Sequence, residues 1–212
     1  GLKPGDEVIT SDFTFAATVE VVGLLQLVPV IVDVDPDTFN ISVDAIRKAI
    51  TPKTKAIIPV HLFGQCADME AILKLAKEHN IYVVEDTAQA IGATYTFSDG
   101  KKATAGTMGD IGTTSFFPSK NLGCYGDGGA IYTNNDELAA LMRSIVNHGM
   151  GERYYYERIG VNSRLDSIQA AILRIKLRQL DTYCAKRNKA ATFYDNFFAA
   201  FSNIKTPTRA KN

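Results

Sequence analysis

A lysine and an aspartate, each placed beyond an apolar run, are the side chains best suited to catalysis in this sequence. Lys120 follows IGTTSFF, which we interpret as a buried strand that stops at Pro118, and Asp86 ends the apolar run YVVED. Residues just past strand ends face the mouth of an α/β domain, where ligands bind. A lysine for a Schiff base and an acid for a pyridinium nitrogen are the groups that pyridoxal phosphate (PLP) chemistry needs. The alternatives are a solvated surface lysine and an N-cap formed by Asp86.

Three further side chains could complete such a site. Ser115, five residues before Lys120, could offer its hydroxyl to a phosphate, although a strand serine more often bonds neighbouring backbone. Gln89 follows Asp86 by three residues and would face the same ligand if that segment is helical; otherwise it is a surface amide. Phe15 lies after the first strand, where its ring could stack on a cofactor or belong to the core.

Asn162 and Arg164 lie between an irregular stretch, residues 149–160, and a long helical segment. The planar guanidinium of Arg164 suits an anionic ligand. The alternative is a segment that only starts the helix, with Ser163 or Asp166 as its cap.

The remaining candidate motifs predict no metal site, no acyl-transfer site and no nucleotide P-loop. His61 and His148 are isolated, and we interpret His61 as a packing residue at a strand end. The run GCYGDGG lacks the P-loop spacing, and Asp127-Gly128 indicates a turn into the next strand.

The composition is typical of a soluble globular protein. Of the 212 residues, 46% are hydrophobic and 22% are charged. Basic and acidic residues number 23 each, so no net basic field favours nucleic acid or an anionic membrane. Three widely spaced cysteines predict reduced thiols in a cytoplasm rather than disulfides. No apolar run reaches the ~18 residues that a membrane span needs.

Short apolar runs alternate with segments of helical period along most of the chain. Strands are predicted within DEVIT, PVIVDVD, KAIIPVHLFG, IYVVEDT, IGTTSFF and GGAIYTN, and helices within FAATVEVVGLLQ, SVDAIRKAI, DMEAILKLAKEHN and DELAALMRSIVNHG. This alternation predicts an α/β fold with three αβα layers and a mostly parallel sheet. One or two long helices are expected from Asp166 to about Phe201. We expect the chain to lack material at both ends, because it opens directly into a strand without methionine.

Taken together, these motifs resemble a known family. TFAAT, PVHLFGQCADM, VVEDTAQAIGA, SFFPSKNLGCYGDGGAI and GVNSRLDSIQAAIL occur in the order found in the PLP-dependent nucleotide-sugar aminotransferases of fold type I, the DegT–StrS family. The resemblance covers essentially the whole chain. Its motifs most resemble those of members that aminate UDP-2-acetamido-2-deoxy-3-oxo-glucuronate.

The resemblance implies a role for the residues named above. Lys120 would form the internal aldimine with PLP and move the proton during transfer of the amino group from glutamate to a nucleotide-linked ketosugar. Asp86 would pair with the pyridine nitrogen, Gln89 with the 3′ oxygen, Phe15 with the ring face and Ser115 with the phosphate.

Asn162 would reach the PLP phosphate of a neighbouring subunit, which implies a homodimer with shared active sites. Arg164 would seat the acidic sugar or the amino donor. The resemblance further implies a cytoplasmic enzyme of surface polysaccharide or lipopolysaccharide biosynthesis, with residues 1–160 as the PLP-binding domain and 161–212 as helices leading to a small domain.

The sequence also departs from the family pattern. Members carry an upstream segment that holds the phosphate and a C-terminal small domain that closes the site, and neither is present here. A second hypothesis is therefore a non-catalytic or regulatory protein that binds PLP or a nucleotide sugar on this scaffold. The presence of Lys120 argues against the sugar-dehydratase branch, in which histidine replaces the lysine.

Overall fold

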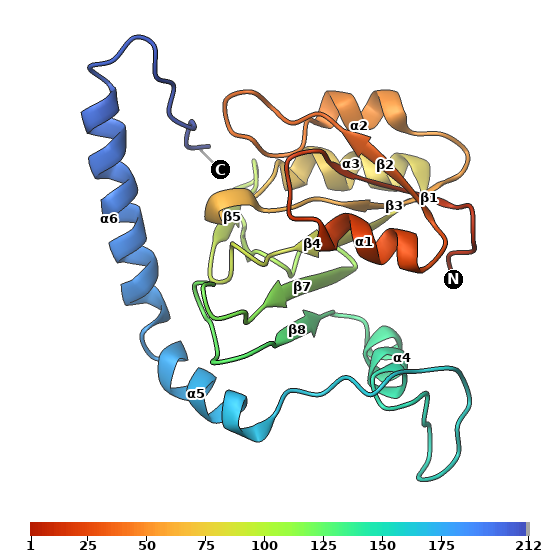
Figure 1. Cartoon of the computed structure of the whole chain (residues 1–212). Coiled ribbons are helices and arrows are strands. Elements are labelled where there is room, and N and C mark those ends of the chain that lie inside the picture. The colour runs from red at the N-terminus through yellow and green to blue at the C-terminus, as the bar shows by residue number, and fades with distance from the viewer. Residues whose placement is uncertain (211–212) are drawn as a thin grey trace.

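The core of the protein is a twisted sheet, with helices packed around it (Figure 1). The computed structural model describes residues 1–210, and within them six strands pair in the order β2-β1-β3-β4-β7-β8. All neighbours are parallel except β7 and β8, which are antiparallel. The strands are β1 (Glu7–Ser11), β2 (Val28–Val32), β3 (Thr54–Ile58), β4 (Tyr82–Asp86), β7 (Ile111–Ser115) and β8 (Gly129–Tyr132). The predicted α/β fold with a mostly parallel sheet is confirmed.

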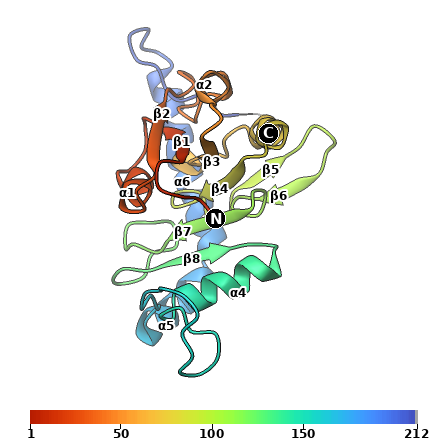
Figure 2. The same cartoon turned by 90° about the vertical axis from the view of Figure 1, so that its right-hand side faces the viewer.

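Helices cover both faces of this sheet, because alternate residues of each strand point to opposite sides. On one face, Val8 and Ala56 pack with Val22 of α1 (Ala17–Leu24). On the other face, Ile9 and Ile57 belong to a larger core that includes buried residues of α2 (Val43–Ala49) and α3 (Met69–His79). Figure 2 shows α1 and α2 on opposite sides of the sheet. Apolar runs in the parallel strands thus reflect burial on both faces.

Local capping explains where two of these helices begin. The Ser42 hydroxyl accepts a hydrogen bond from the Ala45 amide at the start of α2, and Asp68 accepts one from the Ala71 amide at the start of α3. The α3 helix ends at Asn80, which adopts a left-handed conformation with φ of 54°. The next strand, β4, can therefore begin two residues later and run back to the carboxyl edge.

The C-terminal part of the chain is helical, as expected, with one interruption. The segment from Asp166 to Phe201 forms α5 (Ser167–Leu177) and α6 (Leu180–Phe198). Leu173 and Leu180, on either side of the break, are both buried against Leu122 and Cys124 of the loop that follows β7. The two helices therefore diverge while packing on the same loop.

One further segment, a short hairpin, was not predicted from the sequence, whereas the helix after β8 and the irregular stretch that follows it were. The hairpin of β5 (Thr94–Thr96) and β6 (Lys102–Thr104) is absent from the predicted strands, because each strand has only three residues. The Asp99-Gly100 turn between them was the available signal. The α4 helix (Asp136–Ile145) is confirmed, and residues 149–160 form turns and isolated bridges, as the lack of periodicity indicated.

The division at residue 160 stays a prediction, and residues 211 and 212 of its second part lie outside the described residues. Each helix found in residues 1–210 is too short or too polar to cross a membrane.

Candidate active site

Asp86 occupies the last position of β4 and is held by hydrogen bonds from two directions. Its Oδ2 atom accepts from the Thr18 hydroxyl of α1 at 2.8 Å, and its Oδ1 atom accepts from the backbone amide of Ala88 at 2.9 Å. The bond to the Ala88 amide is a local cap of the kind that an N-cap would form. The following TAQA segment, however, forms turns and not a helix, so Asp86 is not a helix N-cap. The carboxylate is half-buried, so it retains access to a ligand. The two donors fix the orientation of the carboxylate at the end of β4.

Gln89 is anchored beside the turn that follows β3. Its Oε1 atom accepts a hydrogen bond from the backbone amide of Phe63 at 2.7 Å, and the side chain is half-buried. The segment forms turns and not the helix on which the prediction for Gln89 rested, but this hydrogen bond holds the side chain in one orientation. Phe63 has a φ of 58°, an unusual conformation for a bulky residue that aims its amide toward Gln89. Because Oε1 accepts this bond, the amide nitrogen of Gln89 is left to donate toward an acceptor oxygen.

Lys120 lies in a tight turn after β7, close in the chain to Ser115. Its backbone amide donates to the Phe117 carbonyl at 2.9 Å, and the Phe117 amide donates to the Ser115 hydroxyl at 3.2 Å. The lysine is half-buried, and within residues 1–210 its Nζ atom has no hydrogen-bond or ion-pair partner. The solvated-lysine alternative is thus only partly correct. Ser115 bonds neighbouring backbone as an acceptor, and its hydroxyl hydrogen is still available to a phosphate.

The strand pairing brings Asp86 and Ser115 to the same edge of the sheet. In the parallel β4–β7 pair, Asp86 is the register partner of Thr113, two residues before Ser115. Phe15 lies two residues before α1, and its carbonyl accepts from the Thr18 amide at 3.1 Å. Phe15 is 75% exposed, which excludes the core alternative within the described chain. Phe15 is thus one turn away from Thr18, the residue whose hydroxyl donates to the Asp86 carboxylate.

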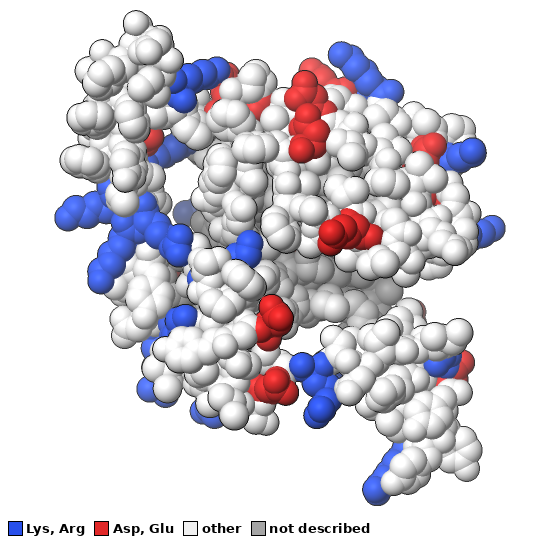
Figure 3. All heavy atoms as spheres, viewed as in Figure 1, with Lys and Arg blue, Asp and Glu red and all other residues white. Residues whose placement is uncertain are grey.

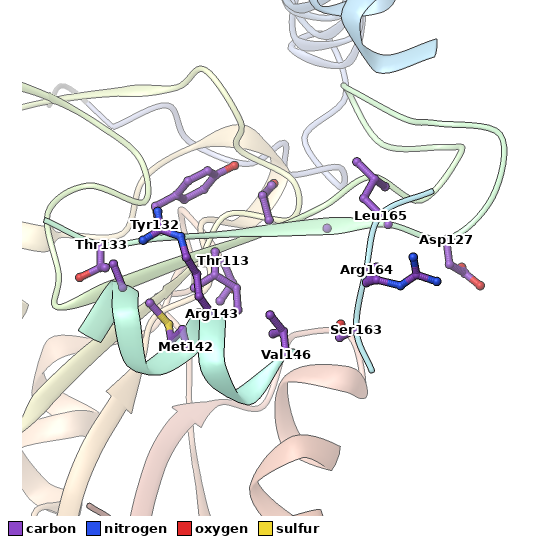
Figure 4. A pocket seen from close by; sticks show the side chains of 16 residues that line it. Thr113, Asp127, Tyr132, Thr133, Met142, Arg143, Val146, Ser163, Arg164 and Leu165 are labelled. Carbon is purple, nitrogen blue, oxygen red and sulfur yellow. The ribbon is translucent and has the colours of Figure 1, made fainter. Parts of the chain in front are cut away.

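Asn162 and Arg164 do not belong to this group of residues. Both are exposed, and the Arg164 Nε atom donates to Asn162 Oδ1 at 3.1 Å. Arg164 lines a cavity of about 800 Å³ between β8, α4 and residues 163–165, whose lining includes neither Lys120 nor Asp86 (Figure 4). Asp166 precedes α5 but forms no side-chain cap, so the capping alternative is wrong for this residue.

One buried hydrogen-bonded pair next to the site, Glu85 and His61, was not predicted from the sequence. Glu85 precedes Asp86 and therefore points to the opposite face of β4, where it is fully buried with His61. Its carboxylate accepts from His61 Nε2 at 2.8 Å and from the backbone amides of Gly106, Met108 and Gly109 at 2.8, 2.7 and 2.6 Å. His61 is thus more than a packing residue. The available signal for Glu85 was the presence of a second acidic residue, directly before Asp86, in the apolar strand sequence VVED.

The environment of Glu85 favours its charged form. Burial alone would raise the pKa, but the hydrogen bonds from His61 and from the amides of Gly109 and Gly106 outweigh it and lower the Glu85 pKa below its ordinary value. The same carboxylate affects Cys66. Burial first, and then the Glu85 charge, raise the pKa of the Cys66 thiol to about 12.

Basic side chains border the loop that carries Lys120. Lys and Arg gather where α5 meets α6, on the left of the view in Figure 3. Arg187 lies with Nη2 3.5 Å from the Ser119 carbonyl, and the Lys176 ammonium contacts the Gly123 carbonyl. These charges favour an anionic ligand near the Lys120 loop, although the whole chain has no net charge.

The donor set fits PLP. Four groups correspond to parts of the cofactor. The half-buried Lys120 suits its aldehyde, and the Asp86 carboxylate suits its ring nitrogen. The free amide N–H of Gln89 suits its ring oxygen, and the exposed Phe15 suits its ring face. Among residues 1–210, no cluster of three or more His, Cys, Asp or Glu side chains could hold a metal ion.

Comparison with known proteins points to the same chemistry. The sequence model of the DegT/DnrJ/EryC1/StrS aminotransferase family matches residues 1–212. The UDP-2-acetamido-2-deoxy-3-oxo-D-glucuronate aminotransferase of Pseudomonas aeruginosa is 54% identical over 92% of the chain and 53% of its own length. A protein of Geobacillus stearothermophilus described as a pleiotropic regulatory protein is 54% identical over 92% of the chain and 51% of its own length. The chain spans about half the length of these curated relatives.

A solved structure provides a comparison at the level of the fold. The NtdA protein of Bacillus subtilis, crystallised with the bound cofactor PMP, superposes with a TM-score of 0.82 and 40% sequence identity. The match covers 96% of this chain and 45% of that protein.

Proposed function

The chain belongs to the DegT/DnrJ/EryC1/StrS aminotransferase family, and from this premise we propose that the intact protein transfers an amino group from glutamate to a nucleotide-linked ketosugar with PLP as cofactor. The observation that carries the proposal is the convergence of Asp86, Gln89, Ser115 and Lys120 at the carboxyl edge of β4 and β7. PLP, when bound, supplies an electron sink that stabilises negative charge on the carbon next to the amine nitrogen.

Each residue then has a defined task. Lys120 would hold the cofactor through Nζ, and its amine, when free, would act as the base and acid that moves a proton. Asp86, oriented by Thr18 and Ala88, would pair with the ring nitrogen. Gln89 donates to the ring oxygen, because Phe63 occupies its carbonyl. Phe15 covers one face of the ring and excludes water from it.

The phosphate and the substrate require further groups. Ser115 donates its hydroxyl to the phosphate. Arg164 lines a different cavity and donates a hydrogen bond to Asn162, which supports a role for this pair in the site of a second copy within a homodimer. Arg164 there binds the acidic sugar or the donor carboxylate. The basic border of the Lys120 loop supports an anionic, nucleotide-linked substrate.

The cellular setting follows from the same chemistry. The name of the P. aeruginosa relative supports a UDP-linked 3-keto sugar acid as substrate. For such a substrate we propose surface polysaccharide or lipopolysaccharide biosynthesis as the process. Three free cysteines support a cytoplasmic location, where thiols stay reduced.

Borohydride trapping on the intact gene product tests the proposal. The protein with PLP should absorb visible light, and peptide mapping after reduction should find the pyridoxyl group on Lys120. The Lys120→Ala variant is the matched control and should carry no label. A label on another lysine, or none on the wild-type protein, would reject the assignment.

A second candidate function is PLP or nucleotide-sugar binding without turnover, for which the regulatory name of the G. stearothermophilus relative is the supporting observation. Glutamate separates the two candidates. An aminotransferase should convert the spectrum of the lysine-bound cofactor to that of pyridoxamine phosphate, whereas a binding protein should leave it unchanged.

A further inference from the structure

The buried pair of His61 and Glu85 has a fixed arrangement of protons. The Ala67 amide donates to His61 Nδ1 at 3.1 Å, so Nδ1 carries no hydrogen. The hydrogen of a neutral ring is therefore on Nε2, which donates to Glu85 Oε2 at 2.8 Å. Both side chains have no solvent exposure. Because water does not reach this hydrogen bond, water cannot replace either partner. The bond therefore constrains the backbone segments that His61 and Glu85 contact.

Glu85 and His61 also connect three segments of the chain. Glu85 binds the amides of residues 106–109, which precede β7, and His61 binds the turn that follows β3. The His61 amide donates to the Asp86 carbonyl at 3.0 Å, and the Asp86 amide donates to the Pro59 carbonyl at 2.9 Å. The backbone of Asp86 is therefore held by Pro59 and His61, at the start of this turn.

The same turn determines the orientation of Gln89. Phe63, two residues after His61, donates its amide to Gln89 Oε1 from a left-handed conformation. Such a conformation persists in a bulky residue only where the surroundings enforce it. The His61 ring, bonded to Ala67 and Glu85, is one constraint on this turn. The Asn40 side chain, which bonds the Leu62 amide and the carbonyls of Gln65 and Cys66, is another.

We infer that Glu85 and His61 are a buried positioning pair, which orients the Asp86 carboxylate and the Gln89 amide toward the cofactor from the opposite face of β4. The inference rests on the proposed function and adds two residues to the site that do not touch the cofactor. Their effect passes through the backbone of Asp86 and through the turn that carries Phe63.

The test is PLP affinity measured by titrating the apoprotein of the intact gene product, together with the thermal midpoint with and without PLP. The His61→Ala variant should bind PLP about tenfold more weakly, the low end of what loss of an orienting partner costs a metal ligand. Because ligand stabilisation follows the ratio of ligand concentration to Kd, the increase in midpoint on adding PLP should shrink accordingly.

Two variants refine the test and cover the case in which His61→Ala does not fold. His61→Gln can still donate an amide N–H to Glu85, so its PLP affinity should lie closer to the wild type. Glu85→Gln should behave like His61→Ala, because its amide group would face the backbone N–H donors of residues 106–109. Ile72→Val is the control, because it removes a methylene group from the same core without touching the pair. It should lower the thermal midpoint of the apoprotein and leave the PLP affinity unchanged.

The outcomes separate this inference from the proposed function. Wild-type protein that fails to bind PLP would reject both. Folded His61→Ala and Glu85→Gln variants with wild-type PLP affinity would reject the positioning role alone, whatever their thermal midpoints, and would leave the proposed function intact.

Discussion

The hydroxyl of Thr18 donates a hydrogen bond to Asp86 Oδ2 at 2.8 Å and so joins α1 to the end of β4 across 68 residues of sequence. Thr18 also lies with its hydroxyl 3.1 Å from that of Thr14. Because the Thr18 hydrogen is committed to Asp86, Thr14 must be the donor in this second contact. The chain of hydroxyls orients the carboxylate and holds the start of α1, where Phe15 lies, against the sheet.

Replacing Thr18 with valine removes this donor without changing the shape of the side chain. Thr18 is only 6% exposed, so water cannot fully replace the lost hydrogen bond. We expect the free energy of unfolding to fall by about 1.5–3 kcal/mol, the range for a hydrogen bond to a charged group. Urea denaturation of the intact gene product measures this change. Thr18→Ser keeps the hydroxyl and should lose less than Thr18→Val; equal stability of the valine variant and wild type would contradict the assignment.

Replacing Lys120 with arginine keeps the positive charge but removes the nucleophilic amine. Amino transfer should fall by at least about a thousandfold, as for loss of other covalent catalysts. Because Lys120 Nζ has no partner within residues 1–210, stability should change by no more than about 0.5 kcal/mol. Transaminase assays and urea denaturation measure the two effects, and substantial residual turnover in the variant would exclude a covalent role for Lys120.

The stability of the protein should depend on Glu85 at acidic pH. The pKa of Glu85 is lower in the folded protein than its ordinary value. Its stabilising contribution is therefore complete above the ordinary pKa, near 4.5, and is lost as the pH falls toward the lower folded pKa. Urea midpoints measured from pH 6 to pH 3 should decline more steeply for wild type than for Glu85→Gln. Parallel pH profiles would show that Glu85 does not contribute.

The cysteines should differ in their reactivity toward iodoacetamide. The thiolate is the reactive form, and burial together with the Glu85 charge raises the pKa of Cys66 to about 12. Cys66 is also only 5% exposed, whereas Cys184 is half-buried. At pH 8, peptide mass spectrometry should detect alkylated Cys184 well before alkylated Cys66. Denaturant should abolish the difference, and equal native rates would contradict the structure around Cys66.

Two glycines should respond oppositely to substitution by alanine. A Cβ atom on Gly112 would lie 2.1 Å from the Gly106 carbonyl oxygen, so the loop that binds Glu85 would have to move. We expect Gly112→Ala to cost about 3 kcal/mol or more. Gly23 lies in α1 with no atom within 4 Å of a Cβ, and Gly23→Ala should stabilise by about 0.5–1 kcal/mol. Urea denaturation of both variants checks the pair.

Much of the fold could be predicted because its elements are encoded locally. Buried parallel strands require apolar runs such as YVVED, and helices require apolar residues at three-to-four spacing, so both patterns were legible. The hairpin of β5 and β6 was missed because three-residue strands give no periodic signal. The break between α5 and α6 was likewise not located, because Leu173 and Leu180 are placed by packing on a distant loop.

The sequence by itself determined which residue types stand at the strand ends, including Lys120, Asp86, Gln89 and Ser115, since a strand end is a local property of the chain. Only the tertiary structure decided what these side chains face. Hydrogen bonds such as Thr18 to Asp86, Phe63 to Gln89 and His61 to Glu85 join segments 68, 26 and 24 residues apart. Such distant pairs leave no periodic signal in the sequence and form only when the strands adopt their order in the sheet.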